Sequence, residues 1–173
     1  PFNADAVVSH WQRILDPESR LLAKVMIKPI LSVEKTGDHE VQFLLQHAWI
    51  PFTAVLTTPS GFISTIPSPL AVREGIHHRA PVGTGPFTFK EWKSGDRIVL
   101  TKNPEYWQKG KPYLDKVVFL IIPDHEARYN ALVSGQADMI ITDWATHVEK
   151  LKNNPDFTTY IFDYRSLTAL LLN

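Results

Sequence analysis

Two glycines near the middle of the chain raise the question of phosphate binding. Gly83 and Gly85 bracket Thr84 in the stretch PVGTGPFTF, and phosphate-binding loops also depend on closely spaced glycines. Such a loop continues into a helix with a lysine and a hydroxyl residue, and its backbone N–H groups hold the anion. Here Pro86 removes one N–H, and the residues after it alternate between apolar and polar as in a strand. We therefore predict that the glycines turn the backbone into a strand and bind no phosphate.

The histidines and carboxylates form no recognisable metal or catalytic motif. Among the seven histidines, His77 and His78 are the only adjacent pair, and sequence neighbours on a regular element rarely bind one metal together. The sequence contains neither an H-E-x-x-H spacing nor a G-x-S-x-G nucleophile turn. A Ser–His–Asp triad built from distant residues leaves no such motif, so a hydrolase stays open as an alternative. We expect no metal, no cofactor and no catalytic residue.

Charge and cysteine content exclude several classes of protein. Lys plus Arg equals Asp plus Glu, 18 against 18, so no net field attracts nucleic acid or an anionic membrane, and we expect no nucleic-acid partner. The chain has no cysteine, which excludes disulfides, thiol catalysis and thiolate metal sites. No apolar run approaches the roughly 20 residues of a membrane span. Hydrophobic residues make up 44% of the chain and charged residues 21%, as is typical of globular proteins.

Aromatic residues are concentrated after the glycine pair. Trp92, Tyr106, Trp107 and Tyr113 follow one another closely, with Phe87, Phe89 and Phe119 nearby. We predict that these rings form a hydrophobic core beneath a β-hairpin. The alternative is that they line a ligand cleft, because binding sites are mostly apolar with a few polar anchors.

An irregular segment rich in Gly and Pro, residues 76–85, divides the elements that position these residues. Before it, Asn3 is the expected cap of a helix whose apolar residues recur at helical spacing up to Leu15, ahead of Asp16-Pro17. The remaining expected elements of this half are a β-hairpin of strands 30–35 and 40–46, helices at 50–56 and 68–75, and a brief strand at 62–67.

Beyond the irregular segment the pattern changes to strands alternating with helices. Residues 85–92 and 97–103 alternate around the turn KSGD, which predicts a second hairpin. The continuous apolar run 116–123 predicts a strand buried on both faces. Expected helices at 125–135, capped by Asp124, and at 146–154 alternate with expected strands at 137–142, 157–162 and 167–173. This order favours an α/β layer.

The chain reads VGTGPFTFKEWKSGDRIVLTKNPEYW and then GKPYLDKVVFLIIPDHEARYNALVSGQADM. Together these two runs resemble the signature region of the family 5 extracellular solute-binding proteins. That family comprises the peptide-type and nickel-type receptors of bacterial ABC importers. Upstream, PFNADAVVSHWQRILDP and SVEKTGDHEVQFLLQHAWIPFTAVL resemble a helix, a hairpin and a further helix of the same family. The final SLTALLLN resembles the strand that leads out of the first lobe, so the resemblance covers essentially the whole chain in family order.

The resemblance implies a class II periplasmic-binding-protein-like α/β lobe, with a mixed sheet flanked by helices and a small α+β accessory subdomain. Residues 1–80 would form the accessory subdomain, and residues 81–173 the hinge-bearing α/β subdomain of the first lobe. The glycine pair would then mark the crossing between these subdomains. We expect the lobe to be incomplete, with further strands before Pro1 and a second lobe after Asn173.

The resemblance also implies a ligand-contacting segment at Gly61, Phe62 and Ile63, because SGFISTIP corresponds to a stretch that approaches the cleft in the family. Nickel-type members tend to carry an arginine there that meets the carboxylates of a metal chelate. This chain has no arginine between Thr57 and Pro67, which favours a peptide over a chelate.

A second candidate ligand contact is the turn Thr142, Asp143 and Trp144. It follows an expected strand, and open α/β sheets bind ligands at the carboxyl ends of their strands. Asp143 could meet an amine, and Trp144 could pack on a side chain of the ligand. The alternative is an ordinary capped turn.

We therefore expect the substrate-binding component of an ABC importer, which captures di- to oligopeptides and delivers them to the permease subunits in the membrane. A receptor for nickel or another metal chelate is the alternative within the family. The expected location is the periplasm or cell envelope, with a lipid anchor in a Gram-positive cell. Strands without neighbours expose unpaired backbone, so we also expect the 173 residues to self-associate.

Overall fold

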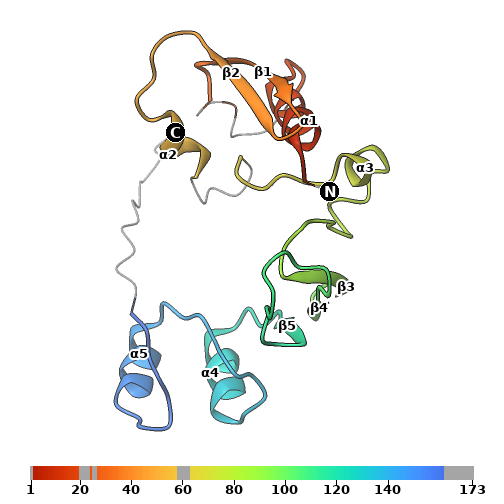
Figure 1. The fold of residues 1–173 in the computed structure, drawn as a ribbon. Helices are drawn as coiled ribbons and strands as arrows, with labels where there is room; N and C mark the ends of the chain where they lie inside the picture. The colour runs from red at the N-terminus through yellow and green to blue at the C-terminus, as the bar shows by residue number, and fades with distance from the viewer. Residues whose placement is uncertain (1, 20–23, 25–26, 58–62, 162–173) are drawn as a thin grey trace. The chain divides into compact units, whose positions relative to one another are not determined.

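The computed structural model describes residues 2–19, 24, 27–57 and 63–161. The chain falls into two compact units, residues 1–119 and 120–173, and each unit is described by itself (Figure 1). The boundary near residue 80 that the sequence suggests stays a prediction.

The first helix, α1, spans Ala4–Leu15 and begins where the sequence predicts. Asn3 has extended backbone and accepts a hydrogen bond from the Ala6 N–H through Oδ1 at 3.1 Å, which satisfies one of the free N–H groups at the helix start. The helix ends at Asp16, ahead of Pro17. One face of α1 is apolar and packs against the hairpin described next.

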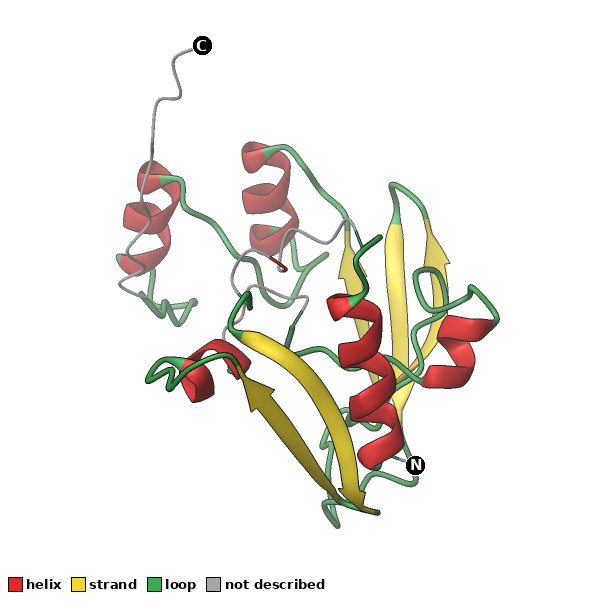
Figure 2. Ribbon diagram, turned by 90° about the horizontal axis from the view of Figure 1, so that it is seen from above, coloured by secondary structure: helices red, strands yellow, loops and turns green. Residues whose placement is uncertain are grey.

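Strands β1 (Ile30–Gly37) and β2 (Glu40–Leu45) form the predicted antiparallel hairpin, with Val33 opposite Phe43. Figures 1 and 2 show the hairpin lying beside α1. The alternating residues of β2 that the sequence assigns to one face, Val41, Phe43 and Leu45, all pack against the core beneath α1. The predicted hairpin and its buried face are therefore confirmed.

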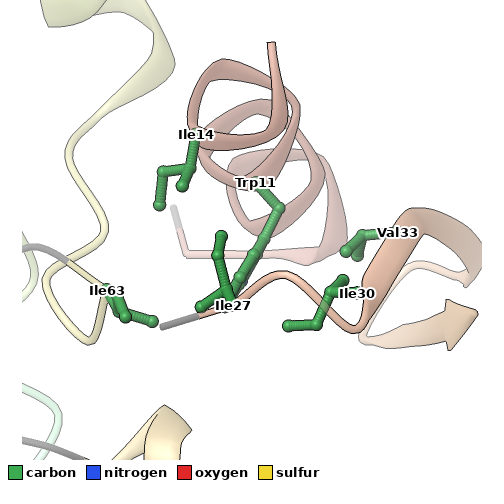
Figure 3. Packing of buried hydrophobic residues seen from close by; sticks show 6 residues of the cluster. All are labelled: Trp11, Ile14, Ile27, Ile30, Val33 and Ile63. Carbon is green, nitrogen blue, oxygen red and sulfur yellow. The ribbon is translucent and has the colours of Figure 1, made fainter. Parts of the chain in front are cut away.

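The core of this unit is one cluster of buried side chains between α1 and the hairpin (Figure 3): Trp11, Ile14, Ile27, Ile30, Val33 and Ile63. The Trp11 ring meets Phe43 edge to face, with ring centroids 5.2 Å apart. Burying each large apolar side chain contributes about 1.5–3 kcal/mol, so this cluster is a major source of stability for the unit.

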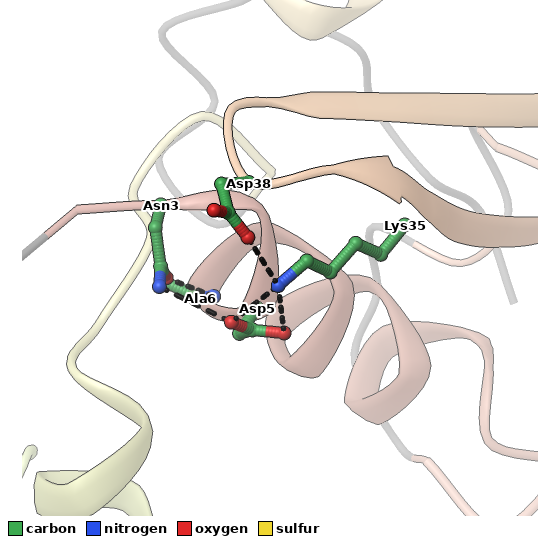
Figure 4. A network of polar contacts seen from close by, with 5 residues as sticks. All are labelled: Asn3, Asp5, Ala6, Lys35 and Asp38. Carbon is green, nitrogen blue, oxygen red and sulfur yellow. Dashed lines mark hydrogen bonds and ion pairs between the residues drawn. The ribbon is translucent and has the colours of Figure 1, made fainter.

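A polar network joins the start of α1 to the hairpin turn (Figure 4). The Lys35 ammonium lies 3.0 Å from Asp5 and 3.2 Å from Asp38. Hydrogen bonds to these two carboxylates raise the pKa of Lys35, and the bond to Asp5 has the larger effect. The Ala4 N–H also donates to the Asp38 carbonyl at 2.9 Å. The network therefore fixes the end of the helix against the turn.

Two short helices follow, α2 (Phe52–Leu56) and α3 (Pro69–Arg73), and both were predicted. Ser68 caps α3 by accepting a hydrogen bond from the Ala71 N–H at 3.5 Å. The strand expected at 62–67 is absent from its described part, residues 63–67. The Ile63 carbonyl accepts from a histidine instead of a strand neighbour, and Pro67 has no N–H to offer a ladder.

The second hairpin is also confirmed. Strands β3 (Phe87–Lys93) and β4 (Arg97–Lys102) pair antiparallel, and β5 (Lys116–Leu120) follows β4 in a three-stranded sheet of order β3-β4-β5. Gly95 in the turn has φ +74°, a left-handed conformation that glycine adopts without a steric penalty.

The burial predicted for β5 is wrong in the described structure, as is that predicted for Trp107 and Tyr113, whereas Phe87, Phe89 and Tyr106 are half-buried. Four of the five β5 residues are exposed, whereas the continuous apolar run predicted burial on both faces. Trp107 and Tyr113 are 73% and 84% exposed, so they form no core beneath the hairpin. The physical reason is that β5 is the last strand of its sheet, and no helix among the described elements packs extensively against it.

The second unit contains α4 (His125–Val133) and α5 (Ala145–Lys152), as predicted. The Asp124 carboxylate caps α4 by accepting from the Ala127 N–H at 2.7 Å, and Gly135 with φ +73° follows its end.

The strands expected at 137–142 and 157–162 are not formed over residues 137–142 and 157–161, and the one at 167–173 lies outside the described residues. A strand requires a hydrogen-bonded neighbour, and these two stretches have none among the described residues.

Candidate functional site

Three of the predicted ligand contacts form a turn in the second unit, immediately before α5. The Trp144 N–H donates to the Thr142 hydroxyl at 3.2 Å, which closes the turn. The Asp143 side chain is 92% exposed, and Trp144 is 48% exposed at the cap position of the helix. The turn therefore presents an exposed carboxylate and, at the next residue, a half-exposed indole.

His125, the first residue of α4, supports this turn. Its imidazole lies on the Trp144 indole, with centroids 4.7 Å apart and planes 30° apart. Its Nδ1 is 2.9 Å from Arg128 Nη2 and 3.8 Å from Asp143 Oδ1. These two contacts need different protonation states, because Arg128 donates to a bare Nδ1 whereas an ion pair with Asp143 needs a protonated ring.

We assign the neutral ring with its proton on Nε2, because the contact to Arg128 is the shorter and has hydrogen-bond geometry. In this state His125 leaves the Asp143 carboxylate available for a cationic group of a ligand. Arg128 fixes the imidazole, and the imidazole fixes the indole.

A second histidine joins α4 to α5 beneath the turn. His147 is 0% exposed, its Nε2 lies 2.8 Å from the Glu126 carboxylate, and its ring stacks on Tyr129 at 4.7 Å. The Lys150 ammonium lies 5.4 Å from the centre of the same Tyr129 ring. This arrangement holds the amino end of α5, and with it the turn, against α4.

Sequence reasoning missed the support from His125, Arg128 and His147. His125 and Arg128 are one helical turn apart, so the sequence places them on one face of the helix. Nothing in the sequence indicates that this face meets a tryptophan from a turn 19 positions downstream, since that contact depends on the packing of two helices.

The other predicted ligand segment lies in the first unit. Gly61 and Phe62 lie outside the described residues. The Ile63 side chain is buried in the core beside Trp11, so it offers no surface to a ligand, while Ser64 and Thr65 after it are exposed. Any contact near Ile63 would therefore come from its neighbours, and the contact predicted for this segment stays a prediction.

A shallow apolar depression of about 340 Å³ lies beside the second hairpin. Phe87, Tyr106 and Tyr113 line it with two prolines and a leucine, and Lys111 supplies the one charged side chain. Its apolar lining matches the alternative interpretation of the aromatic residues, but its polar groups are too few to orient a ligand.

Over the described parts of the chain, no three His, Asp or Glu side chains gather closely enough to hold a metal ion. A search of the same residues for a helix with the length and apolar character of a membrane span also found none.

Comparison with known proteins identifies the family to which the whole chain is similar. Residues 1–173 match the family model described as bacterial extracellular solute-binding proteins, family 5 Middle. The chain is 31% identical over 172 residues to di/tripeptide-binding protein 2 of Pseudomonas aeruginosa, covering 91% of this chain and 32% of that protein. It is also 31% identical over 141 residues to the nickel-binding periplasmic protein of Escherichia coli, covering 81% and 27% respectively.

A solved structure is similar in fold as well as in sequence. The ABC transporter-associated periplasmic binding protein DppA from Helicobacter pylori, in complex with the peptide STSA, superposes with a TM-score of 0.73 at 30% identity. The match covers 89% of this chain and 33% of that one. The chain thus has the fold of part of a periplasmic binding protein and spans about a third of the length of the curated relatives it matches.

Proposed function

Because this chain belongs to the bacterial extracellular solute-binding proteins of family 5, we propose that it is part of the substrate-binding component of an ABC importer for di- to oligopeptides. The observation that carries the proposal on this chain is the exposed Asp143–Trp144 pair, which the neighbouring helix α4 holds in place. Relatives named for peptide binding, and a structural neighbour in complex with a peptide, support the choice of solute.

The Asp143–Trp144 pair suits a peptide for chemical reasons. The carboxylate accepts charge-assisted hydrogen bonds from an ammonium group, which are stronger than those between neutral partners. The exposed part of the indole is suited to packing against an apolar or a cationic side chain. The neutral His125 ring adds no charge of its own that would repel the ammonium, and the Arg128 guanidinium, which keeps its positive charge, points one of its N–H groups at that ring. The segment of Gly61, Phe62 and Ile63 remains a separately predicted contact, in which the exposed neighbours Ser64 and Thr65 would take the place of the buried Ile63 side chain.

The proposed role is capture and delivery outside the cytoplasmic membrane, in the periplasm or cell envelope, with transfer of the solute to permease subunits. The chain carries out no reaction on the solute in this proposal. A receptor for a nickel or other metal chelate is the second candidate, because one relative is named for nickel binding. The absence of arginine between Thr57 and Pro67 makes it the weaker one.

Isothermal titration of the full-length protein with di- to pentapeptides tests the proposal, with N-acetylated peptides and a nickel chelate as comparisons. Asp143→Asn should weaken the binding of free-amine peptides by about 10- to 100-fold, the size of one charge-assisted hydrogen bond, and affect acetylated peptides much less. Asp156→Asn is the matched control, because Asp156 is an exposed aspartate of the same unit, and it should leave affinity unchanged. Binding of the chelate with no binding of any peptide would contradict the peptide assignment.

A further inference from the structure

A buried histidine of α1 contacts the predicted ligand segment of the first unit. His10 is 2% exposed, and its Nε2 lies 3.0 Å from the Ile63 carbonyl oxygen, 53 positions along the chain. A carbonyl oxygen only accepts hydrogen bonds, so Nε2 carries the ring proton and donates it. The neutral ring with the proton on Nε2 satisfies this contact.

The other ring nitrogen of His10 makes protonation unfavourable. Nδ1 is buried and has no hydrogen-bond partner among the described residues. A second proton would place an N–H there without an acceptor and a positive charge where water is excluded. Burial therefore lowers the pKa of His10, the positive charge of Arg13 one turn along lowers it further, and the hydrogen bond to Ile63 offsets part of this effect.

The charged groups around α1 do not provide a partner for a second proton. The segment 63–67 has no titratable side chain. Helix α3, which packs against α1, carries Arg73 in its last turn and Glu74 as its C-cap. On the hairpin side, Lys35 is paired with Asp5 and Asp38 at the start of α1.

The segment that His10 contacts is held at both ends. At one end the Ile63 side chain is buried with Trp11 and Ile14 in the core (Figure 3). At the other end Ser68 caps α3. Between these anchors, Ser64 and Thr65 are exposed and directly follow the anchor at Ile63 along the backbone.

We propose that His10 is a positioning residue for the segment 63–67: protonation keeps its Nε2–H donor but places a charge and an unpaired Nδ1–H in the buried site, which favours release of the segment, so that acid weakens solute binding. The inference rests on the proposed function, in which this segment contacts the solute. His10 itself is buried and acts through the Ile63 carbonyl.

The sign of the pH effect follows from the two states of the segment. The anchored state disfavours protonated His10, whereas a released segment would let the ring titrate normally. The anchor is therefore fully effective above the ordinary histidine pKa of about 6.5 and weakens as pH falls below it. Each unit of pKa difference between the two states amounts to a tenfold change in their ratio.

Titration of the full-length protein with a bound dipeptide at pH 7.5 and pH 5.0 tests the inference, with two variants. His10→Gln places an amide N–H near the position of Nε2 and does not titrate, so at both pH values it should bind with about the affinity that wild type has at pH 7.5. His10→Leu removes the donor and leaves the Ile63 carbonyl buried without a partner, so it should bind about tenfold more weakly at both. Wild type should lose affinity at the lower pH, and His10→Gln should not.

Hydrogen exchange of the amides of residues 64–66 distinguishes a wrong choice of solute from a wrong role for His10. After correction for the intrinsic pH dependence of exchange, protection should fall between pH 7.5 and 5.0 in wild type and stay constant in His10→Gln. If no peptide binds at any pH while this pattern appears, the proposed solute is wrong and the anchoring role of His10 stands. An identical pH profile in wild type and His10→Gln, or unchanged affinity and protection in His10→Leu, would overturn the inference.

Discussion

Removing the His147 side chain should loosen the contact between α4 and α5 and shift the turn that carries Asp143 and Trp144. The ring is fully buried, so truncation to alanine removes buried surface and leaves a cavity, at a cost of about 2–4 kcal/mol by analogy with other large-to-small core substitutions. Loss of the stacking on Tyr129 at 4.7 Å contributes about 0.5–1.5 kcal/mol of this cost.

The partner carboxylate of His147 provides the matched control. The Glu126 side chain is 66% exposed, so water solvates it when its hydrogen bond at 2.8 Å is lost. Glu126→Gln keeps the shape of the side chain and can still accept from Nε2. It should therefore cost less than about 1 kcal/mol, the usual net value of one hydrogen bond with an exposed partner.

Hydrogen exchange measured on the full-length protein resolves this effect by region, because local unfolding has its own free energy. In His147→Ala, amides of residues 125–133 and 145–152 should lose protection, while those of α1 should not change. Solute affinity should fall as well, since α5 begins at the turn. Equal losses in His147→Ala and Glu126→Gln, or a loss in α1 as large as that in α4, would refute the assignment of His147 as a packed support.

Two further predictions concern the polar network and the strand edges. Hydrogen bonds to Asp5 and Asp38 raise the pKa of Lys35. The stability that this network contributes is therefore present below the ordinary lysine pKa of about 10.4 and is lost as pH rises through the higher pKa of the folded state. Melting temperatures measured from pH 7 to 11 should accordingly fall less steeply in Lys35→Met than in wild type. The isolated 173 residues should self-associate through edges such as β5, where Phe119 is exposed, and a monomeric sedimentation profile at high concentration would contradict this.

The elements that local sequence determines were predictable. Asn3 and Asp124 cap α1 and α4 because a short side chain with an oxygen reaches the free N–H groups of the next turn. The two hairpins were predictable because each alternating pattern meets its partner across a short turn, such as the one at Gly95. In each case the contacts lie within 15 residues along the chain.

For strands that need partners from distant parts of the chain, the pairing or the burial was not predicted correctly from local sequence. The apolar run that includes β5 indicates a strand whose two faces are covered, yet it does not say which residues cover them. Residues 137–142 have the composition of a strand, but their backbone has no hydrogen-bonded neighbour in the described residues. Apolar composition therefore predicts that a segment needs to be buried. Which strand or helix buries it depends on the whole fold.

The same distinction applies to the candidate site. Asp143 and Trp144 stay predicted ligand contacts: the sequence suggests them because α/β proteins place ligand contacts in a turn after a strand, although the expected strand is not formed over residues 137–142. His10 and His147 were not, because nothing local distinguishes a buried histidine from an exposed one. Their roles follow from what each ring meets: a carbonyl 53 positions away for His10, and a carboxylate and an aromatic ring on a neighbouring helix for His147. Sequence thus suggests candidate groups for contact with a solute, whereas the buried histidines proposed to position them emerge only from the tertiary contacts.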